Sequence, residues 1–259
     1  FGSISVSAAD DTASFSDADA IDLAGVTAGT FNLNAGGAVT DTADLVIGTG
    51  NITTSGDLVT LDDPDNDFTV AINVDTSNAG GSTPVNVVIE DTNALPLGTI
   101  IADALTATAD GSITQASGAI TVSALNVTSE DAGEFSDIQL TATANSITGE
   151  ITAAGEDIAI TNAAAAAAAG QPGTTNGVIT TNGGGTADTT NDGLGQDSDG
   201  DFLLTSTGGG IGQAAGDSLV IAGSTSLVAQ NGGTFYDVLV ANTGNNFSDA
   251  DPMRRPQIR

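Results

Sequence analysis

The chain is a succession of short segments in which apolar and polar residues alternate one by one. The clearest of these segments cover residues 68–74, 105–109, 138–144, 158–160 and 219–221. Such alternation is typical of a β-strand with one buried face, because successive side chains of a strand point to opposite sides. β-branched residues are frequent in the segments, and Gly, Asn and Asp separate them. The pattern predicts an all-β fold of short strands.

The alternating segments also recur within longer units. Three stretches begin at Phe31, Leu105 and Leu203 and share one order: a strand, a turn, a single Ile or Val, a polar turn and two further strands. A weaker copy begins at Ile138. Recurrence at roughly 20–25 residues is typical of stacked coils, in which neighbouring coils bury the apolar face that one coil cannot bury alone. We therefore expect a parallel β-solenoid, with a β-sandwich as the alternative.

The composition favours the solenoid over the sandwich. Aromatic residues make up 3% of the chain and Trp is absent, whereas a sandwich usually has a large aromatic core. The chain has no Cys, so stacking, hydrogen bonds or bound ions must stabilise it in place of disulfides.

The charge balance restricts the partners. The chain has 33 acidic residues, three basic residues and no His, for a net charge of −30. Nucleic acid is excluded as a partner because phosphate binding requires Lys and Arg. The longest uniform apolar run, residues 163–169, is far shorter than the ~20 residues of a membrane-spanning helix, so we expect no membrane insertion. A body this acidic attracts cations.

The repeats LNAGGAVTDTADLVIGTGNITTSGDLVTL and TATADGSITQASGAITV are similar to those of filamentous haemagglutinin-like adhesins and related giant bacterial surface proteins. The resemblance covers roughly residues 21–161 and 201–246. It implies a right-handed parallel β-helix that is exported to the cell surface and acts as a stalk, filament or adhesin. The chain departs from these proteins in lacking Lys and in its interruption near residues 162–200.

Four regions follow from these patterns. We expect solenoid coils over residues 1–161, a low-complexity excursion rich in Ala, Gly and Asp over 162–200, continuing coils over 201–251, and a basic tail over 252–259.

The excursion contains the sharpest local motif, DSDGD at residues 197–201. Carboxylates that alternate around a Gly offer hard oxygen ligands, which Ca²⁺ prefers. The motif resembles the short DxDGD turns of extracellular calcium modules and lacks the final Glu of an EF-hand, since that position is Gly208. It predicts a calcium site, with a solvated acidic loop as the alternative, formed by Asp192, Asp197, Asp199 and Asp201.

A second acidic group surrounds Pro64, directly before the strand that begins at Phe68. It offers a weaker cation site, composed of Asp62, Asp63, Asp65 and Asp67. An acidic turn between two strands is the favoured interpretation, because Asp side chains supply hydrogen bonds within turns.

All positive charge lies in the last six residues, at Arg254, Arg255 and Arg259. One hypothesis is a subunit contact in which this basic tail docks on the acidic body of the next copy. The alternative is a frayed terminus.

We expect no enzyme, because the chain lacks His and Cys for general base or nucleophilic chemistry. The expected function is structural: a stalk, sheath or filament subunit at an extracellular surface, built by coil stacking and head-to-tail self-assembly with calcium. Its partners are other copies or neighbouring repeats of a longer chain. The alternative is an adhesin that binds a glycan or a host surface protein through loops on one flank. Such loops usually carry aromatics or Arg, which residues 162–200 lack.

Overall fold

The fold is all-β and consists of parallel strands that stack into a β-solenoid, as the alternation predicted. No helix occurs in the described part of this computed structural model, which therefore offers no helix long and apolar enough to cross a membrane. The described residues are 2–77, 83–132, 134–149, 151–163, 174–175, 179–181, 202–207, 210–213, 219–221, 225–231, 233–241 and 243–247.

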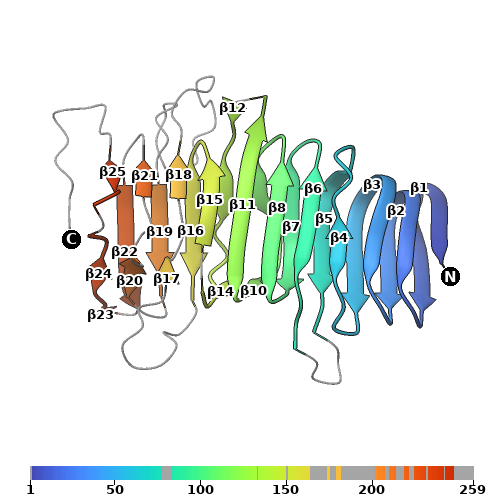
Figure 1. Cartoon of the computed structure of the whole chain (residues 1–259), viewed down its shortest axis with the longest axis horizontal. Coiled ribbons are helices and arrows are strands. Elements are labelled where there is room, and N and C mark those ends of the chain that lie inside the picture. The colour runs from blue at the N-terminus through green and yellow to red at the C-terminus, as the bar shows by residue number, and fades with distance from the viewer. Residues whose placement is uncertain are drawn as a thin grey trace.

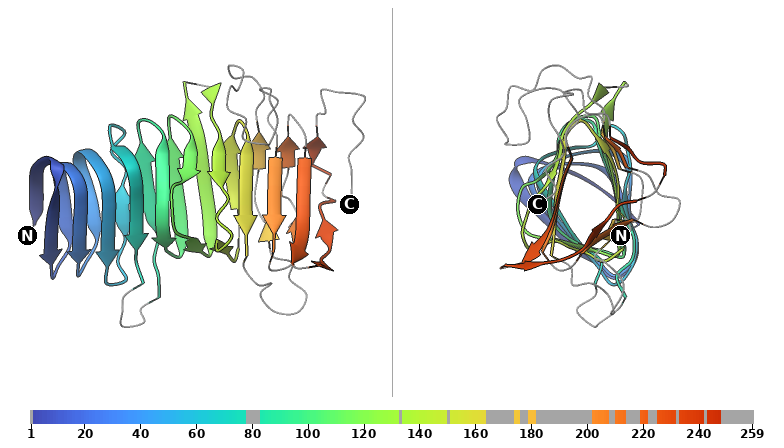
Figure 2. Two further views of the ribbon diagram at one scale, coloured as in Figure 1. Left: turned by 180° about the vertical axis from the view of Figure 1, so that it is seen from behind. Right: turned by 90° about the vertical axis from the view of Figure 1, so that its left-hand side faces the viewer.

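The chain winds around one axis (Figure 1). The strand pairings show that each coil passes over three faces in the same order. Between residues 2 and 163 the chain makes about eight turns. Viewed along the axis, the coils superpose on one closed outline (Figure 2). The first coils are formed by long strands that bend over several faces: β1 (Ser3–Asp17), β2 (Ile21–Ala35) and β3 (Val39–Thr54).

The first face continues from the start of β3 as a parallel column of shorter strands. These are β4 (Val59–Leu61), β6 (Val87–Asp91), β8 (Ala104–Ala109), β11 (Ala124–Asp131), β15 (Ile151–Gly155), β18 (Ile179–Thr181), β21 (Leu219–Ile221) and β25 (Asn246–Phe247).

Strands β5 (Asp67–Asp75) and β7 (Leu95–Ile101) extend over the second and third faces. The second face continues in β9 (Ile113–Gln115), β13 (Ile138–Leu140), β16 (Ile158–Asn162), β19 (Phe202–Ser206) and β22 (Thr225–Asn231). The third face comprises β10 (Ile120–Val122), β14 (Ser146–Ile147), β17 (Thr174–Thr175), β20 (Ile211–Gln213) and β24 (Val238–Leu239).

Two short strands pair antiparallel with a coil strand and form hairpins. β12 (Glu134–Phe135) pairs with β11, and β23 (Thr234–Phe235) pairs with β22. The two hairpins lie on opposite sides of the rod in Figure 1.

The core is a set of aliphatic columns that run along the axis. On the first face each member of one column is the register partner of the next, and every one is at most 2% exposed. Burial of each such side chain stabilises the fold by roughly 1.5–3 kcal/mol. The column consists of Ile21, Val39, Val59, Val87, Leu105, Leu125 and Ile151.

A ladder of side-chain amides joins the first coils. The amide of Asn51 donates to Asn32 Oδ1 over 2.9 Å, and the amide of Asn73 donates to Asn51 Oδ1 over 3.0 Å. Ser14 accepts from the amide of Asn32 at one end, and the backbone N–H of Thr99 donates to Asn73 Oδ1 at the other. Five consecutive coils therefore lie in one fixed register, because each amide both donates to and accepts from its neighbours.

Within residues 162–200, the described segments are Asn162, Ala163 and the strands β17 and β18. β18 pairs parallel with β15 before it and β21 after it, so the first-face column passes through this region.

Candidate cation site

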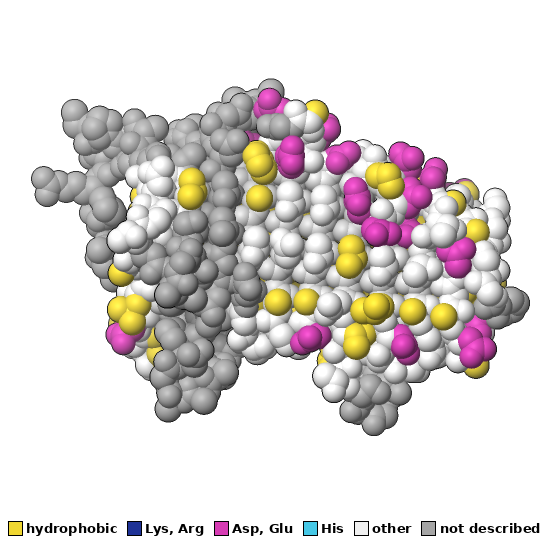
Figure 3. Space-filling view, in the orientation of Figure 1, with side chains coloured by type: hydrophobic (Ala, Val, Ile, Leu, Met, Phe, Trp, Pro, Cys, Tyr) yellow, Lys and Arg dark blue, Asp and Glu magenta, His cyan; other side chains and the backbone are white. Residues whose placement is uncertain are grey.

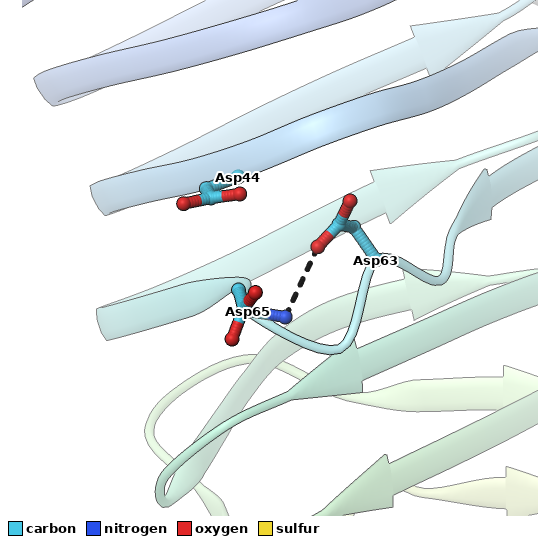
Figure 4. Close-up of side chains that lie close together, drawn as sticks. All are labelled: Asp44, Asp63 and Asp65. Carbon is cyan, nitrogen blue, oxygen red and sulfur yellow. Dashed lines mark hydrogen bonds between the residues drawn. The ribbon is translucent and has the colours of Figure 1, made fainter.

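A group of three carboxylates lies on the N-terminal half of the rod. Asp44 belongs to β3, and Asp63 and Asp65 belong to the turn between β4 and β5 in the following coil (Figure 4). One carboxylate oxygen from each residue lies within 4.8 Å of those of the other two. The group brings together residues from two successive coils.

Two buried polar residues hold the turn in place. Asp41 Oδ1 accepts the N–H of Asp62 over 3.0 Å, and Asp41 Oδ2 accepts the side-chain amide of Asn66 over 2.7 Å. Asn66 Oδ1 in turn accepts the N–H of Leu45 in the preceding coil over 2.9 Å. Burial raises the pKa of the Asp41 carboxyl, and these hydrogen bonds oppose the increase. The turn therefore lies in a fixed position over β3.

Within the turn, Asp63 Oδ1 accepts the N–H of Asp65 over 3.1 Å, as the dashed line in Figure 4 shows. Pro64 lies between the two residues and lacks an N–H. The resulting bend directs both carboxylates toward the side of the turn on which Asp44 lies.

Further carboxylates surround this group, and Figure 3 shows Asp and Glu side chains gathered over these coils. Burial raises the pKa of Glu90, and repulsion from Asp62 and Asp110 adds to the increase. Burial also raises the pKa of Asp91 to about 6, although Asp91 accepts N–H groups from Phe68 and Asn93. No Lys or Arg lies within the described residues to offset this charge, since all three Arg residues fall in 254–259.

The three carboxylates fit a hard cation such as Ca²⁺. Calcium binds oxygen at 2.3–2.6 Å, so two of its ligand oxygens lie at most about 5 Å apart. The oxygens of Asp44, Asp63 and Asp65 meet that limit without rearrangement. Their combined negative charge also favours a divalent cation over a monovalent one.

The acidic group around Pro64, predicted as a weaker cation site, forms part of this group. Asp63 and Asp65 are brought together by the structure, and Asp62 and Asp67 lie outside the group of three. The prediction did not include Asp44, although Asp44 precedes Asp63 by 19 residues, about one coil (63 − 44). Spacing by one coil is the signal that could have identified it.

The other predicted sites lie outside the described residues. These are the calcium motif of Asp192, Asp197, Asp199 and Asp201 and the basic tail with Arg254, Arg255 and Arg259.

The stacked coils and the recurring turns define the chain as a β-solenoid repeat protein. Residues 9–75 and 85–154 match a family described as repeats of unknown function (DUF5649). Because the two segments cover more than half of the chain, the chain belongs to this family. No curated protein and no solved structure matches it.

Proposed function

We propose that the chain is a rod-forming segment of an extracellular surface protein, whose role is mechanical and whose acidic coils bind calcium. The observation that carries this proposal is the uninterrupted parallel column of the first face, from β2 to β25. A rod of this kind transmits force along its axis through backbone hydrogen bonds between successive coils, and through one continuous aliphatic core.

The surface chemistry supports an extracellular location. A net charge of −30 keeps rods apart in the absence of cations, and the absence of Cys removes any dependence on the redox state of the compartment. The resemblance of the repeats to filamentous haemagglutinin-like surface proteins points in the same direction. The relation to that class is part of the proposal.

Calcium has a defined role in the proposed rod. Asp44 lies in one coil and Asp63 and Asp65 lie in the next, so an ion bound by all three would connect two coils. An ion that bridged acidic surfaces of two rods would allow lateral or end-to-end assembly, because it neutralises the repulsion between them.

Negative-stain electron microscopy with millimolar calcium and with excess EDTA tests the proposal. We expect filaments or bundles in calcium and separate straight rods in EDTA. The variant Asp44→Asn/Asp63→Asn/Asp65→Asn should lose the calcium response. Its matched control, Asp10→Asn/Asp11→Asn/Asp19→Asn, removes the same charge from exposed positions in and just after β1 and should keep the response.

Separate rods in both conditions would overturn calcium-dependent assembly. Saturable binding to one glycan class on an array, unaffected by EDTA, would overturn a purely mechanical role and favour an adhesin.

A further inference from the structure

The three stretches that recur in the sequence have the same burial pattern. Each begins with a strand in which three alternate residues face the core, and all nine are at most 3% exposed. In the third stretch the inward-facing positions start at Phe202, one residue before Leu203, because Leu203 is not among the buried residues. The triplets are Phe31, Leu33 and Ala35; Leu105, Ala107 and Ala109; and Phe202, Leu204 and Ser206.

After a turn, each triplet is followed by one buried aliphatic residue that starts the next face. These residues are Val39, Ile113 and Ile211, and they lie on three different faces. Val39 starts β3 on the first face, Ile113 starts β9 on the second, and Ile211 starts β20 on the third. Equivalent points of the repeat are therefore not stacked above one another.

The number of faces between equivalent points is the same in both intervals. From Ile113 to Ile211 the chain takes ten steps from face to face, because each coil strand after β9 lies on the next face and the hairpin strand β12 is not counted. The strands in order are β9, β10, β11, β13, β14, β15, β16, β17, β18, β19 and β20. From Val39 to Ile113 the chain also takes ten steps, through Ile47, Ile52, Val59, Phe68, Val74, Val87, Leu95, Ile100 and Leu105. Ten steps on a three-faced coil are three turns and one further face.

An Asn occupies the same place in all three copies, five residues after a Leu or Val and two before a Phe or Ile, and it is buried in the first two copies and half-buried in the third. The three turns are Leu61–Asn66–Phe68, Leu140–Asn145–Ile147 and Val240–Asn245–Phe247. In each, the Asn Oδ1 accepts a backbone N–H from the preceding coil: Leu45 over 2.9 Å, Ile120 over 2.9 Å and Leu219 over 3.0 Å. The three turns lie at three different corners, since they lead to the second, third and first face respectively.

We propose that the chain contains three copies of one repeat, each ten faces long and each set one face further around the rod, and that residues 202–247 belong to the third copy. The matched family segments start 76 residues apart (85 − 9), close to the 74 residues from Val39 to Ile113 (113 − 39). Each matched segment thus spans about one copy. The third copy lies beyond residue 154, where the family match ends.

The arrangement has a consequence for the surface of the rod. A residue that occupies the same place in every copy lies on a different one of the three faces in each copy. It returns to the same face only after three copies. The Asn turn is the feature shared by all three, whereas Asp44, Asp63 and Asp65 correspond to uncharged residues in the second copy: Ala119, Ala142 and Ala144. The second copy therefore has no carboxylates at the place of the candidate cation site.

Amide hydrogen exchange of the 259-residue chain, measured residue by residue by NMR, tests the proposal. Asn66→Ala, Asn145→Ala and Asn245→Ala should each accelerate exchange at one amide of the preceding coil, by about fivefold to tenfold, because each removes the acceptor of that N–H. The expected amides are those of Leu45, Ile120 and Leu219, in that order. Asn126→Ala, at an exposed position of β11, is the matched control and should leave all three unchanged.

The third copy is the decisive case. If Asn245→Ala accelerates an amide on the third face in place of Leu219, or no amide at all, the one-face advance is wrong. Asn245→Asp keeps a side-chain oxygen and should retain the protection of Leu219 even if the Ala variant loosens its whole coil. Loss of protection at Leu219 in the Asp variant as well would overturn the assignment of Asn245 to this turn.

Discussion

The side-chain amide of Asn73 lies directly against Gly98 in the following coil. A Cβ atom on Gly98 would be 2.1 Å from Asn73 Oδ1, so no other residue fits there without displacing the amide. Asn73 is the last member of the amide ladder, and its Oδ1 accepts the N–H of Thr99, the residue after Gly98. The close approach thus connects the side-chain ladder of the first coils to the backbone of the next one.

We expect Gly98→Ala to lower the free energy of unfolding by about 1–3 kcal/mol, because the added methyl group displaces Asn73 from its partners. Urea denaturation measures the change. In the double variant Asn73→Ala/Gly98→Ala the clash is gone, so adding Gly98→Ala to Asn73→Ala should have little further effect. Equal effects of Gly98→Ala in both backgrounds would show that the contact with Asn73 is not the cause.

The ladder itself makes a second prediction. Asn51→Asp replaces the amide that donates to Asn32 Oδ1 by a carboxylate oxygen, so two acceptors would face each other. We expect a loss of about 1–3 kcal/mol at neutral pH, by the same urea measurement. Asn34→Asp adds the same charge at an exposed position two residues beyond Asn32 and should be nearly neutral. Similar losses in both variants would mean that added charge matters and the ladder does not.

The sequence predicted the solenoid because alternation and frequent turns are local properties that every coil carries. It also revealed the three recurring stretches. It could not show that each copy lies one face further on, because strands on all three faces have the same alternating pattern. The face on which a given strand lies therefore cannot be predicted from its sequence. The number of faces in a repeat becomes visible only when register partners such as Leu105 and Leu125 are known.

The candidate cation site was only half predictable for a related reason. Asp63 and Asp65 are close in sequence, so a local motif identifies them. Asp44 comes from another coil, so no local motif includes it. Asp41 and Asn66 hold the turn, but Asp and Asn are also common in exposed turns, so the residue types alone do not indicate that these two are buried. Their burial follows from the coil above and the coil below, which local patterns do not specify.

Asp91 predicts the pH dependence of stability. Its pKa in the folded protein is about 6, above the ordinary value of 3.8, so between these values the folded state binds more protons than the unfolded chain. The contribution of Asp91 to stability is therefore fully present below pH 3.8 and is lost as the pH rises through about 6. We expect the free energy of unfolding to increase when the pH falls from 7 to 4.

Urea denaturation across this pH range checks the expectation. Asp91→Asn cannot titrate and should flatten the increase, while Asp10→Asn, at an exposed position of β1, should leave the slope as in the wild type. An unchanged slope in Asp91→Asn would assign the pH dependence to the other carboxylates.

Calcium should stabilise the folded chain through Asp44, Asp63 and Asp65. An ion that binds the folded state raises the melting temperature progressively with its concentration, because binding shifts the unfolding equilibrium. In thermal unfolding followed by circular dichroism, we expect a rise with calcium that is absent in Asp44→Asn/Asp63→Asn/Asp65→Asn and retained in Asp10→Asn/Asp11→Asn/Asp19→Asn. An equal rise in both triple variants would indicate general screening of the acidic surface.

The ten-face repeat predicts that one whole copy can be removed from the rod. Deletion of residues 40–113 joins Val39 to Thr114, and because Val39 and Ile113 are equivalent points, the inward and outward alternation continues across the junction. We expect a folded β-rod shorter by three and a third coils, about 16 Å at the usual strand spacing of about 4.8 Å. Circular dichroism checks the fold, and small-angle X-ray scattering checks the length. Deletion of residues 40–112 leaves one residue more and reverses the alternation after the junction, so this control should fail to fold. If both deletions behave alike, the equivalence of Val39 and Ile113 is incorrect.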